Sequence, residues 1–367
     1  MKQLSQIYTV LLLITCLNGC TSISYYTQAI SGHLALTMAG KPVDSYIASH
    51  ETPDGLRNKL IVSRQARHFA TERLDLPTGN AFKDYVALDH FWVVVNLVAV
   101  PEFSLQAHQW CYPVLGCQAY RGYFHLEDAQ LEEQRFQAKG YDTFIGGVTA
   151  YSTLGWFDDP LHSGFTNLSD DRMVALMFHE LAHQVVYIKE DTGFNESFAT
   201  AVELEGLKLW LAHQGEPSVF EQALVRFELR NKTYALVESA SVDLKNLYRQ
   251  QGILSDSRLR KRKRLIFEEL NASYEGLLDD ENQRTESRGN REEIKGPFGT
   301  PPVAFNNARI ALFKQYNQYV PAFRQLLKQS DYDFPTFYRA VKSLSRQPDG
   351  QRQQMLQDLS ERFKEHF

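Results

Sequence analysis

The stretch FHELAHQVVYIKEDTGFNESFA, residues 178 to 199, decides how the second half of this chain folds and what it can bind. Residues four apart on an α-helix share a face, so His179 and His183 can point their imidazole rings at one ion. Glu180, turned by about 100° from His179, can reach a water molecule bound to that ion. The pattern predicts two metal ligands and one general base on a single helix.

A third ligand is expected on the next helix. Catalytic zinc takes three protein ligands and keeps one position open for water. Glu196 is the candidate, because the residues between it and His183 suffice for a helix end, a turn around Thr192-Gly193 and an antiparallel return. We therefore predict one Zn²⁺ held by His179, His183 and Glu196. The alternative, two core histidines, would bury them with a glutamate and no opposite charge.

Two residues are expected to support the ligands. A histidine ligand usually donates its other ring N–H to a carboxylate or carbonyl. Glu203 lies on the same helical face as Glu196, seven residues on, and is one candidate for this role. Pairing of Glu203 with Lys208 at the surface is an equally open alternative. Asn195 is the second candidate.

The N-terminus indicates a targeting segment. Lys2 precedes a short apolar run, Ile7 to Leu17, which is too short to span a bilayer comfortably. The run ends in Leu17-Asn18-Gly19-Cys20, which resembles a bacterial lipobox. Residues 1–19 are thus expected to be a lipoprotein signal peptide and Cys20 to carry a lipid anchor. Thr21, where inner-membrane lipoproteins carry Asp, favours the outer membrane facing the periplasm; an ordinary secretory signal is the alternative.

The remaining cysteines agree with export. Cys111 and Cys117 lie close together, with Pro113 and Gly116 bending the chain between them. In an oxidising compartment such a pair predicts a disulfide, which would contribute only roughly 2 kcal/mol because its loop is short. Half of a metal site would need a second thiolate pair, which the sequence lacks.

Composition sets the broad class. The chain has 367 residues, 43% of them hydrophobic, and a net charge of −5, which gives no footprint for nucleic acid. A basic run at Arg258 to Arg264 is expected on a solvated helix face, with contact to an anionic surface as the alternative.

The apolar spacing divides the chain into two parts. Strands are expected over about 80–160, including Phe91 to Val100, and helices over about 168–367. One helix is expected from Ser169 or Asp170 to about Ile188, the next from Asn195 to about His213, and a flexible loop from Asp279 to Pro302. We predict an α+β, mainly helical fold, with a small N-terminal sheet beside the metal-binding helices, forming a single domain over 20–367.

The site resembles that of the gluzincins, zinc peptidases whose third ligand is the Glu of an Asn-Glu pair. His179-Glu-Leu-Ala-His183 followed by Phe194-Asn-Glu-Ser-Phe-Ala199 carries the likeness, and its second part is closer to the aminopeptidase branch. The chain departs from the pattern in its shorter spacing and in Thr200, where thermolysin-type enzymes carry Asp. It also lacks the Gly-x-Met-Glu-Asn element that grips a substrate's free amine.

The mature chain also resembles a bacterial family of predicted lipoprotein aminopeptidases. The likeness implies a membrane-anchored zinc peptidase with peptide substrates, an aminopeptidase in the first place, in which Glu180 takes a proton from the zinc-bound water. An endopeptidase of the same chemistry and a non-catalytic zinc-binding envelope lipoprotein are the alternatives. The motifs that carry the likeness are Pro101-Glu-Phe-Ser104, Trp110-Cys-Tyr-Pro113, Tyr120-Arg-Gly-Tyr-Phe124, Ala150-Tyr-Ser-Thr-Leu-Gly-Trp156, Phe178 to Gln184 and Asn306-Asn-Ala308.

Such a reaction needs a second donor for the oxyanion, and the sequence does not identify it. Tyr151, Tyr123 and Arg121 are the candidates for transition-state or substrate contacts, and a packing role is open for each. Tyr187 is a further candidate, with a role in capping the helix end as its alternative. Thr149 to Leu154 is expected to be an edge strand that pairs with the substrate backbone.

Overall fold

The computed structural model describes residues 25–90, 92–112, 116–148, 158–287, 294–314 and 319–363. Helices dominate and the strands form small sheets, so the expected α+β, mainly helical class is confirmed. Among the described residues, no helix has both the length and the apolar character needed to cross a bilayer.

The first half of the chain holds all the strands among the described residues. Residues 25–38 form the first helix. The elements that follow are β1 (Lys41–Pro42), α2 (Val43–Ala48), α3 (Asp54–Leu74), β2 (Asp84–Val86), β3 (Val94–Pro101), β4 (Trp110–Tyr112), β5 (Gly116–Gln118), β6 (Arg121–Tyr123), α4 (Leu126–Gln137), β7 (Tyr141–Val148) and β8 (Leu161–His162).

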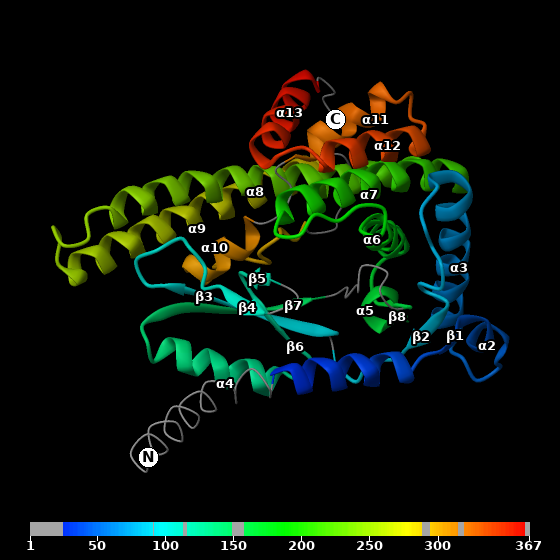
Figure 1. Ribbon diagram of the computed structural model, residues 1–367, viewed down its shortest axis with the longest axis horizontal. Coiled ribbons are helices and arrows are strands. Elements are labelled where there is room, and N and C mark those ends of the chain that lie inside the picture. Colours follow the sequence, from blue (N-terminus) through cyan, green and yellow to red (C-terminus); the bar gives the residue numbers. More distant parts are fainter. Residues whose placement is uncertain are drawn as a thin grey trace, which may run out of the picture.

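The second half is helical where the structure describes it. Its helices are α5 (Ser163–Thr166), α6 (Asp170–Ala182), α7 (Thr192–Gln214), α8 (Val219–Tyr248), α9 (Asp256–Ser287), α10 (Asn307–Phe313), α11 (Val320–Gln329), α12 (Phe334–Ser345) and α13 (Asp349–Arg362). Figure 1 shows β3 to β7 between α4 below and α6 to α10 above, with α11 to α13 at the top.

β3 is the centre of the main sheet and pairs antiparallel with both β6 and β7. Its side chains alternate between two apolar layers. Leu97 and Ala99 pack on the α4 side, whereas Val98 and Val100 pack with Ala308 of α10. Because both faces are covered, β3 carries an uninterrupted apolar run from Leu97 to Val100.

Two smaller sheets flank this one. In the first, β2 pairs antiparallel with β1 and parallel with β8, with Tyr85 opposite both Lys41 and Leu161. In the second, β4 and β5 form a hairpin in which Cys111 faces Cys117. These two cysteines are disulfide-bonded, as expected.

α7 is the central helix of the second half. Its apolar residues are buried on nearly every side, whereas a surface helix buries only one stripe. Phe194 and Phe198 contact the ring of Phe323 in α11, and Phe198 also contacts Phe337 in α12. α6 packs against α7 through a fully buried face that includes Phe178.

The ends of α6 and α7 differ from expectation. α6 stops at Ala182 rather than near Ile188, because the amides of Gln184 and Val185 bond three residues back and tighten the last turn. α7 begins at Thr192, because the Asp191 carboxylate accepts a hydrogen bond from the Phe194 amide at 3.0 Å. The turn expected at Thr192-Gly193 is therefore wrong, and the connection spans residues 183–191.

The expected loop from Asp279 is wrong over its first part, because α9 continues to Ser287. The buried Glu281 explains this helical stretch, since it pairs with Lys232 of α8 and with Arg284. The basic run on α9 also differs from a purely solvated face. Arg260 binds Glu102 through two hydrogen bonds of 2.7 and 2.9 Å, and Lys263 pairs with Asp142 at 2.6 Å.

Removing one partner of the ion pair that joins α7 to α11 should destabilise the fold strongly. Glu205 and Arg324 lie 2.6 Å apart, with side chains only 6% and 4% exposed. We predict that Glu205→Ala costs about 3–5 kcal/mol in urea unfolding, because it leaves a buried charge uncompensated. Asp44→Ala, which breaks an exposed pair with Arg64, is the control and should cost less than about 1 kcal/mol. Equal losses would contradict the prediction.

Candidate metal centre

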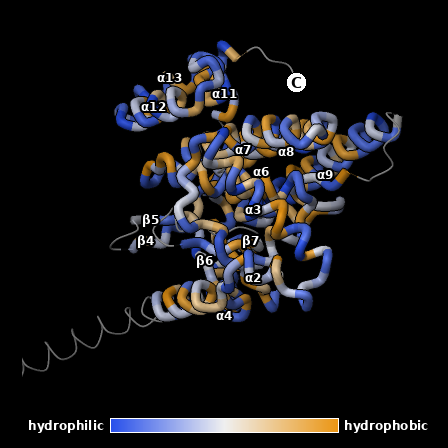
Figure 2. Tube along the Cα trace, turned by 90° about the vertical axis from the view of Figure 1, so that its right-hand side faces the viewer, coloured by the Kyte–Doolittle hydropathy of each residue, from blue (hydrophilic) through white to orange (hydrophobic). Residues whose placement is uncertain are grey.

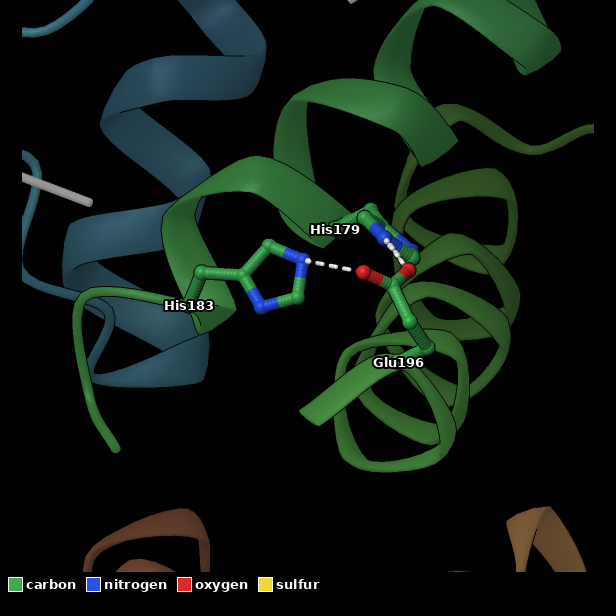
Figure 3. Close-up of side chains that lie close together, drawn as sticks. All are labelled: His179, His183 and Glu196. Carbon is green, nitrogen blue, oxygen red and sulfur yellow. Dashed lines mark hydrogen bonds and ion pairs between the residues drawn. The ribbon is translucent and has the colours of Figure 1, made fainter. Parts of the chain in front are cut away.

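Three donor side chains meet where α6 ends and α7 begins. His179 lies in the last turn of α6, His183 is its C-cap residue, and Glu196 lies in the second turn of α7. His179 Nε2 is 3.3 Å from Glu196 Oε2, and His183 Nε2 is 3.8 Å from Glu196 Oε1. One ligand atom from each residue lies within 4.8 Å of the other two. Figure 3 shows the Glu196 carboxylate facing both imidazole rings.

The donor set fits a small cation. Zinc holds nitrogen and carboxylate oxygen at about 2.0–2.2 Å in a tetrahedron, which places neighbouring ligand atoms roughly 3.3–3.6 Å apart. The separations of 3.3 and 3.8 Å are close to that spacing. The Glu196 side chain is only 18% exposed, and burying a carboxylate is costly unless positive charge compensates it. A divalent cation among the three donors would supply that charge.

The protonation states of the three donors are set by burial and by one another. Burial and the charge of His179 lower the pKa of His183 to about 4. Burial raises the pKa of Glu196, but its hydrogen bond with His179 outweighs this, so the net pKa is lowered. His183 is therefore neutral and Glu196 ionised at neutral pH, the forms in which each binds a metal.

Glu203 holds the ring of His179. Its Oε2 lies 3.0 Å from His179 Nδ1, which leaves Nε2 facing the other donors. Burial lowers the pKa of His179, but its hydrogen bonds to Glu196 and Glu203 raise the pKa well above its ordinary value. Cation binding at His179 Nε2 would thus displace a proton. The structure brings Glu203 to the place expected for a supporting carboxylate.

Asn195 fixes the connection between the ligands rather than a ligand itself. Its side-chain NH₂ donates to the Ile188 carbonyl at 2.7 Å, and its side-chain oxygen accepts from the Ile188 amide at 2.8 Å. Asp191 in the same connection pairs with Arg352 of α13 at 2.8 Å, and the Arg352 side chain is only 4% exposed. Contacts at Ile188 and Asp191 therefore fix the path of the chain between His183 and Glu196.

Glu180 lies next to the donors on α6 and is poised to exchange a proton near neutrality. Burial raises the pKa of Glu180 to about 7; the charge of His179 opposes this rise, and those of Glu196 and Asp159 add to it. A general base works best with a pKa near the working pH. A cation at the neighbouring donors would lower the pKa again.

Arg121 and Tyr123 lie on the other side of the main sheet from the helices that carry the donors. Arg121 Nη1 is 3.0 Å from the Glu132 carboxylate on α4, and the Tyr123 hydroxyl donates to the same carboxylate. This placement does not support the expected contact of these two residues with substrate. Tyr151 and the expected edge strand at Thr149 to Leu154 lie outside the described residues.

Tyr120 is the residue that sequence reasoning missed. It packs on the α10 side of the sheet, with Val98 and Ala308. Burial, together with the nearby groups Tyr187 and Glu196, raises the pKa of Tyr120 to about 12. The sequence motif Tyr120-Arg-Gly-Tyr-Phe124 contains Tyr120, but Tyr120 precedes β6, so strand alternation alone would not have identified it.

The disulfide hairpin lies against the connection between the ligands. Gly116 of β5 has a φ of +75°, and a Cβ added there would meet Glu190 Oε1 at 2.5 Å and Lys189 Cε at 2.6 Å. A glycine at this position therefore allows the hairpin to approach the connection closely. The hairpin leads directly to Tyr120 and forms part of the site's surroundings.

Two other places do not join the centre. A cavity of about 230 Å³ between the sheet, α8 and α10 is lined by residues such as Ala119, Ser241 and Lys314, and by none of the three donors. The Asn306 side chain caps α10 by accepting from the Arg309 amide at 2.9 Å.

Comparison with known proteins finds one family. The family model described as "Putative aminopeptidase" matches residues 24–356, a span that includes the three donors and Glu180. Comparison with curated proteins finds no match, and comparison with solved structures finds none either.

Removing the carboxylate that holds His179 should weaken metal binding without unfolding the protein. We predict that Glu203→Ala raises the zinc dissociation constant by about 10- to 100-fold, because the His179 ring loses its orientation and its proton acceptor. Competition with a chelating indicator measures this constant. Glu216→Ala, at an exposed position just beyond α7, is the control and should leave it unchanged. An unchanged constant for Glu203→Ala would show that Glu203 does not position the ligand.

Proposed function

The chain belongs to the family described as "Putative aminopeptidase", and from this premise we propose that it hydrolyses peptide bonds with a zinc ion held by His179, His183 and Glu196. The observation that carries the proposal is the convergence of these three donors beside Glu180. Two nitrogens and one oxygen form a donor set that catalytic zinc uses. A zinc ion bound there supplies an activated water molecule near neutral pH and polarises the scissile carbonyl.

Glu180 performs the proton transfers. Its carboxylate accepts a proton from the attacking water and returns it to the leaving amine. Its position after His179 turns it away from the ligand face while keeping it on the same helical turn. Its partly buried position raises its pKa, and a cation at the neighbouring donors would lower the pKa again, which favours the ionised form that accepts the first proton.

Tyr120 is our candidate for the donor that stabilises the developing oxyanion. The hydroxyl of this half-buried residue stays protonated, because its pKa of about 12 lies far above neutrality. A preorganised donor in a site that excludes water is worth more than one exposed to solvent. Arg121 and Tyr123 are already engaged with Glu132.

An aminopeptidase must also bind the free amine of its substrate. Asp159 is our candidate for this contact, because it is only 4% exposed and its charge raises the pKa of Glu180. The endopeptidase alternative rests on the missing Gly-x-Met-Glu-Asn element. A structural zinc site is less well supported, because such sites have four protein ligands and three donors converge among the described residues.

We further propose that the protein is a lipoprotein of the bacterial cell envelope, anchored through Cys20 in the outer membrane and facing the periplasm. The apolar run from Ile7 to Leu17 and the lipobox-like residues before Cys20 support this. The Cys111–Cys117 disulfide agrees with an oxidising compartment. The substrates would then be periplasmic peptides.

Replacing the proposed base should abolish hydrolysis and spare the metal. We predict that Glu180→Gln lowers kcat on free-amine peptides by about 10²- to 10⁴-fold, because it removes proton transfer. Zinc content, measured by mass spectrometry of the metal, should stay at one ion per chain. Glu216→Gln is the matched control and should retain full activity.

The choice of substrate separates the alternatives. Hydrolysis of N-acetylated peptides alone by the wild type would replace the aminopeptidase assignment with an endopeptidase. A wild type that binds one zinc ion and hydrolyses neither substrate class would favour the non-catalytic protein.

Removing the Tyr120 hydroxyl should affect the chemical step selectively. We predict that Tyr120→Phe lowers kcat by about 10²- to 10³-fold with little change in KM or zinc content, because the lost donor acts on the transition state. Tyr123→Phe should reduce stability through its lost hydrogen bond to Glu132, yet leave kcat per folded molecule unchanged. A lower kcat for Tyr123→Phe together with an unchanged kcat for Tyr120→Phe would contradict this prediction and assign the donor role to Tyr123.

A further inference from the structure

One face of the helix at residues 25–38 packs against the body of the protein. Gln28 donates to the Gly122 carbonyl at 3.3 Å and accepts from the Phe124 amide at 3.1 Å. A Cβ added to Gly32 would lie 2.3 Å from the Phe124 ring, so the helix and that ring are in close contact. Leu36 completes this inner face and is buried. The helix orientation is therefore fixed.

The opposite face of this helix is apolar and exposed. Ile30, Leu34 and Met38 follow one another at intervals of four and are 58%, 52% and 82% exposed. At that spacing they form one stripe, on the side away from Gly32. The other exposed positions of the helix are Thr27, Ser31 and Ala35.

This face also lacks charge. No Asp, Glu, Lys or Arg occurs between Lys2 and Lys41, although 23% of the whole chain is charged. A helix that faces water usually carries charged residues on its exposed side. Neighbouring α4 adds the exposed Leu131, but it also carries the exposed charges Glu127 and Arg135. The uncharged surface is thus confined to the first helix.

The position of Cys20 identifies what covers this surface. Four residues separate Cys20 from Tyr25, where the helix is first described, and five extended residue steps span at most about 18 Å. A lipid on Cys20 would therefore hold Tyr25, where the described helix begins, within about that distance of the bilayer. The inner face of the described part of the first helix is bound to the protein, which leaves only its outer face for contact with a bilayer.

We propose that the face formed by Ile30, Leu34 and Met38, the docking face, lies against the lipid bilayer, with the helix parallel to the membrane surface. This inference rests on the proposed lipidation of Cys20. An uncharged apolar stripe that enters the interface adds buried apolar area to the attachment that the lipid provides.

Docking on this face would orient the whole molecule. The first helix (blue) lies with α4 at the lower edge of Figure 1, and α11 to α13 lie at the opposite edge. The turned view of Figure 2 shows the same separation of α4 from α12 and α13. α6 and α7, which carry the three metal donors, lie above the sheet. The metal centre would therefore face away from the membrane, toward soluble peptides.

The test places a single fluorescent label on the lipidated full-length protein. The disulfide occupies Cys111 and Cys117 and the lipid occupies Cys20, so Leu34→Cys supplies one labelling site. The protein is reconstituted in vesicles of phosphatidylethanolamine and phosphatidylglycerol, with and without spin-labelled lipid. Leu265→Cys, 51% exposed on α9, is the matched control.

We expect blue-shifted emission and several-fold stronger quenching by spin-labelled lipid at position 34 than at position 265. The double substitution Ile30→Glu/Met38→Glu in the labelled protein should abolish the difference in quenching between positions 34 and 265. Its zinc affinity should stay unchanged. Equal quenching at both positions, with lipid on Cys20 shown by mass spectrometry, would overturn docking and leave the proposed anchor and activity intact. A blue shift without lipid quenching would assign the face to a second copy of the chain instead. A Cys20 without lipid would overturn both the anchor and the docking that rests on it.

Discussion

The arrangement depends on one buried carboxylate. Glu196 must face two imidazole rings that come from a different helix, and it has little access to water that could solvate its charge. The fold meets this demand by ending α6 at His183 and starting α7 soon afterwards. Two contacts hold the connection in that shape: Asn195 binds the Ile188 backbone, and Arg352 binds Asp191. These contacts add to the packing of α6 on α7 in positioning the third donor relative to the first two.

The β-layer contributes the other side of the site. β3 separates two apolar layers, so each position on the neighbouring strand β6 faces either α4 or α10. This alternation turns Arg121 and Tyr123 toward Glu132, and Tyr120, which precedes β6, packs on the α10 side with Val98 and Ala308. The disulfide hairpin reaches the connection between the ligands through Gly116. The strands and the helical half therefore meet at the candidate centre.

The local part of the site was predictable from sequence, and the long-range part was not. A spacing of four places His179 and His183 on one face of any helix, and the Asn-Glu pair pointed to the third donor. The path of the connection after α6 could not be predicted, because it depends on hydrogen bonds from Asn195 to a residue seven positions earlier. The length of α9 depends on Glu281 meeting Lys232 of another helix. The sequence identified the motif that contains Tyr120. Which residue of this motif lies on the donor side could not be predicted, because it depends on the pairing of Arg121 and Tyr123 with Glu132 of α4.

The central claim is that one zinc ion lies among His179, His183 and Glu196, and anomalous diffraction at the zinc absorption edge tests it most directly. Crystals of the protein grown with zinc should show one strong peak, about 2.0–2.2 Å from His179 Nε2, His183 Nε2 and a Glu196 carboxylate oxygen. A peak bound by other residues, or none at the three donors at full zinc loading, would contradict the account.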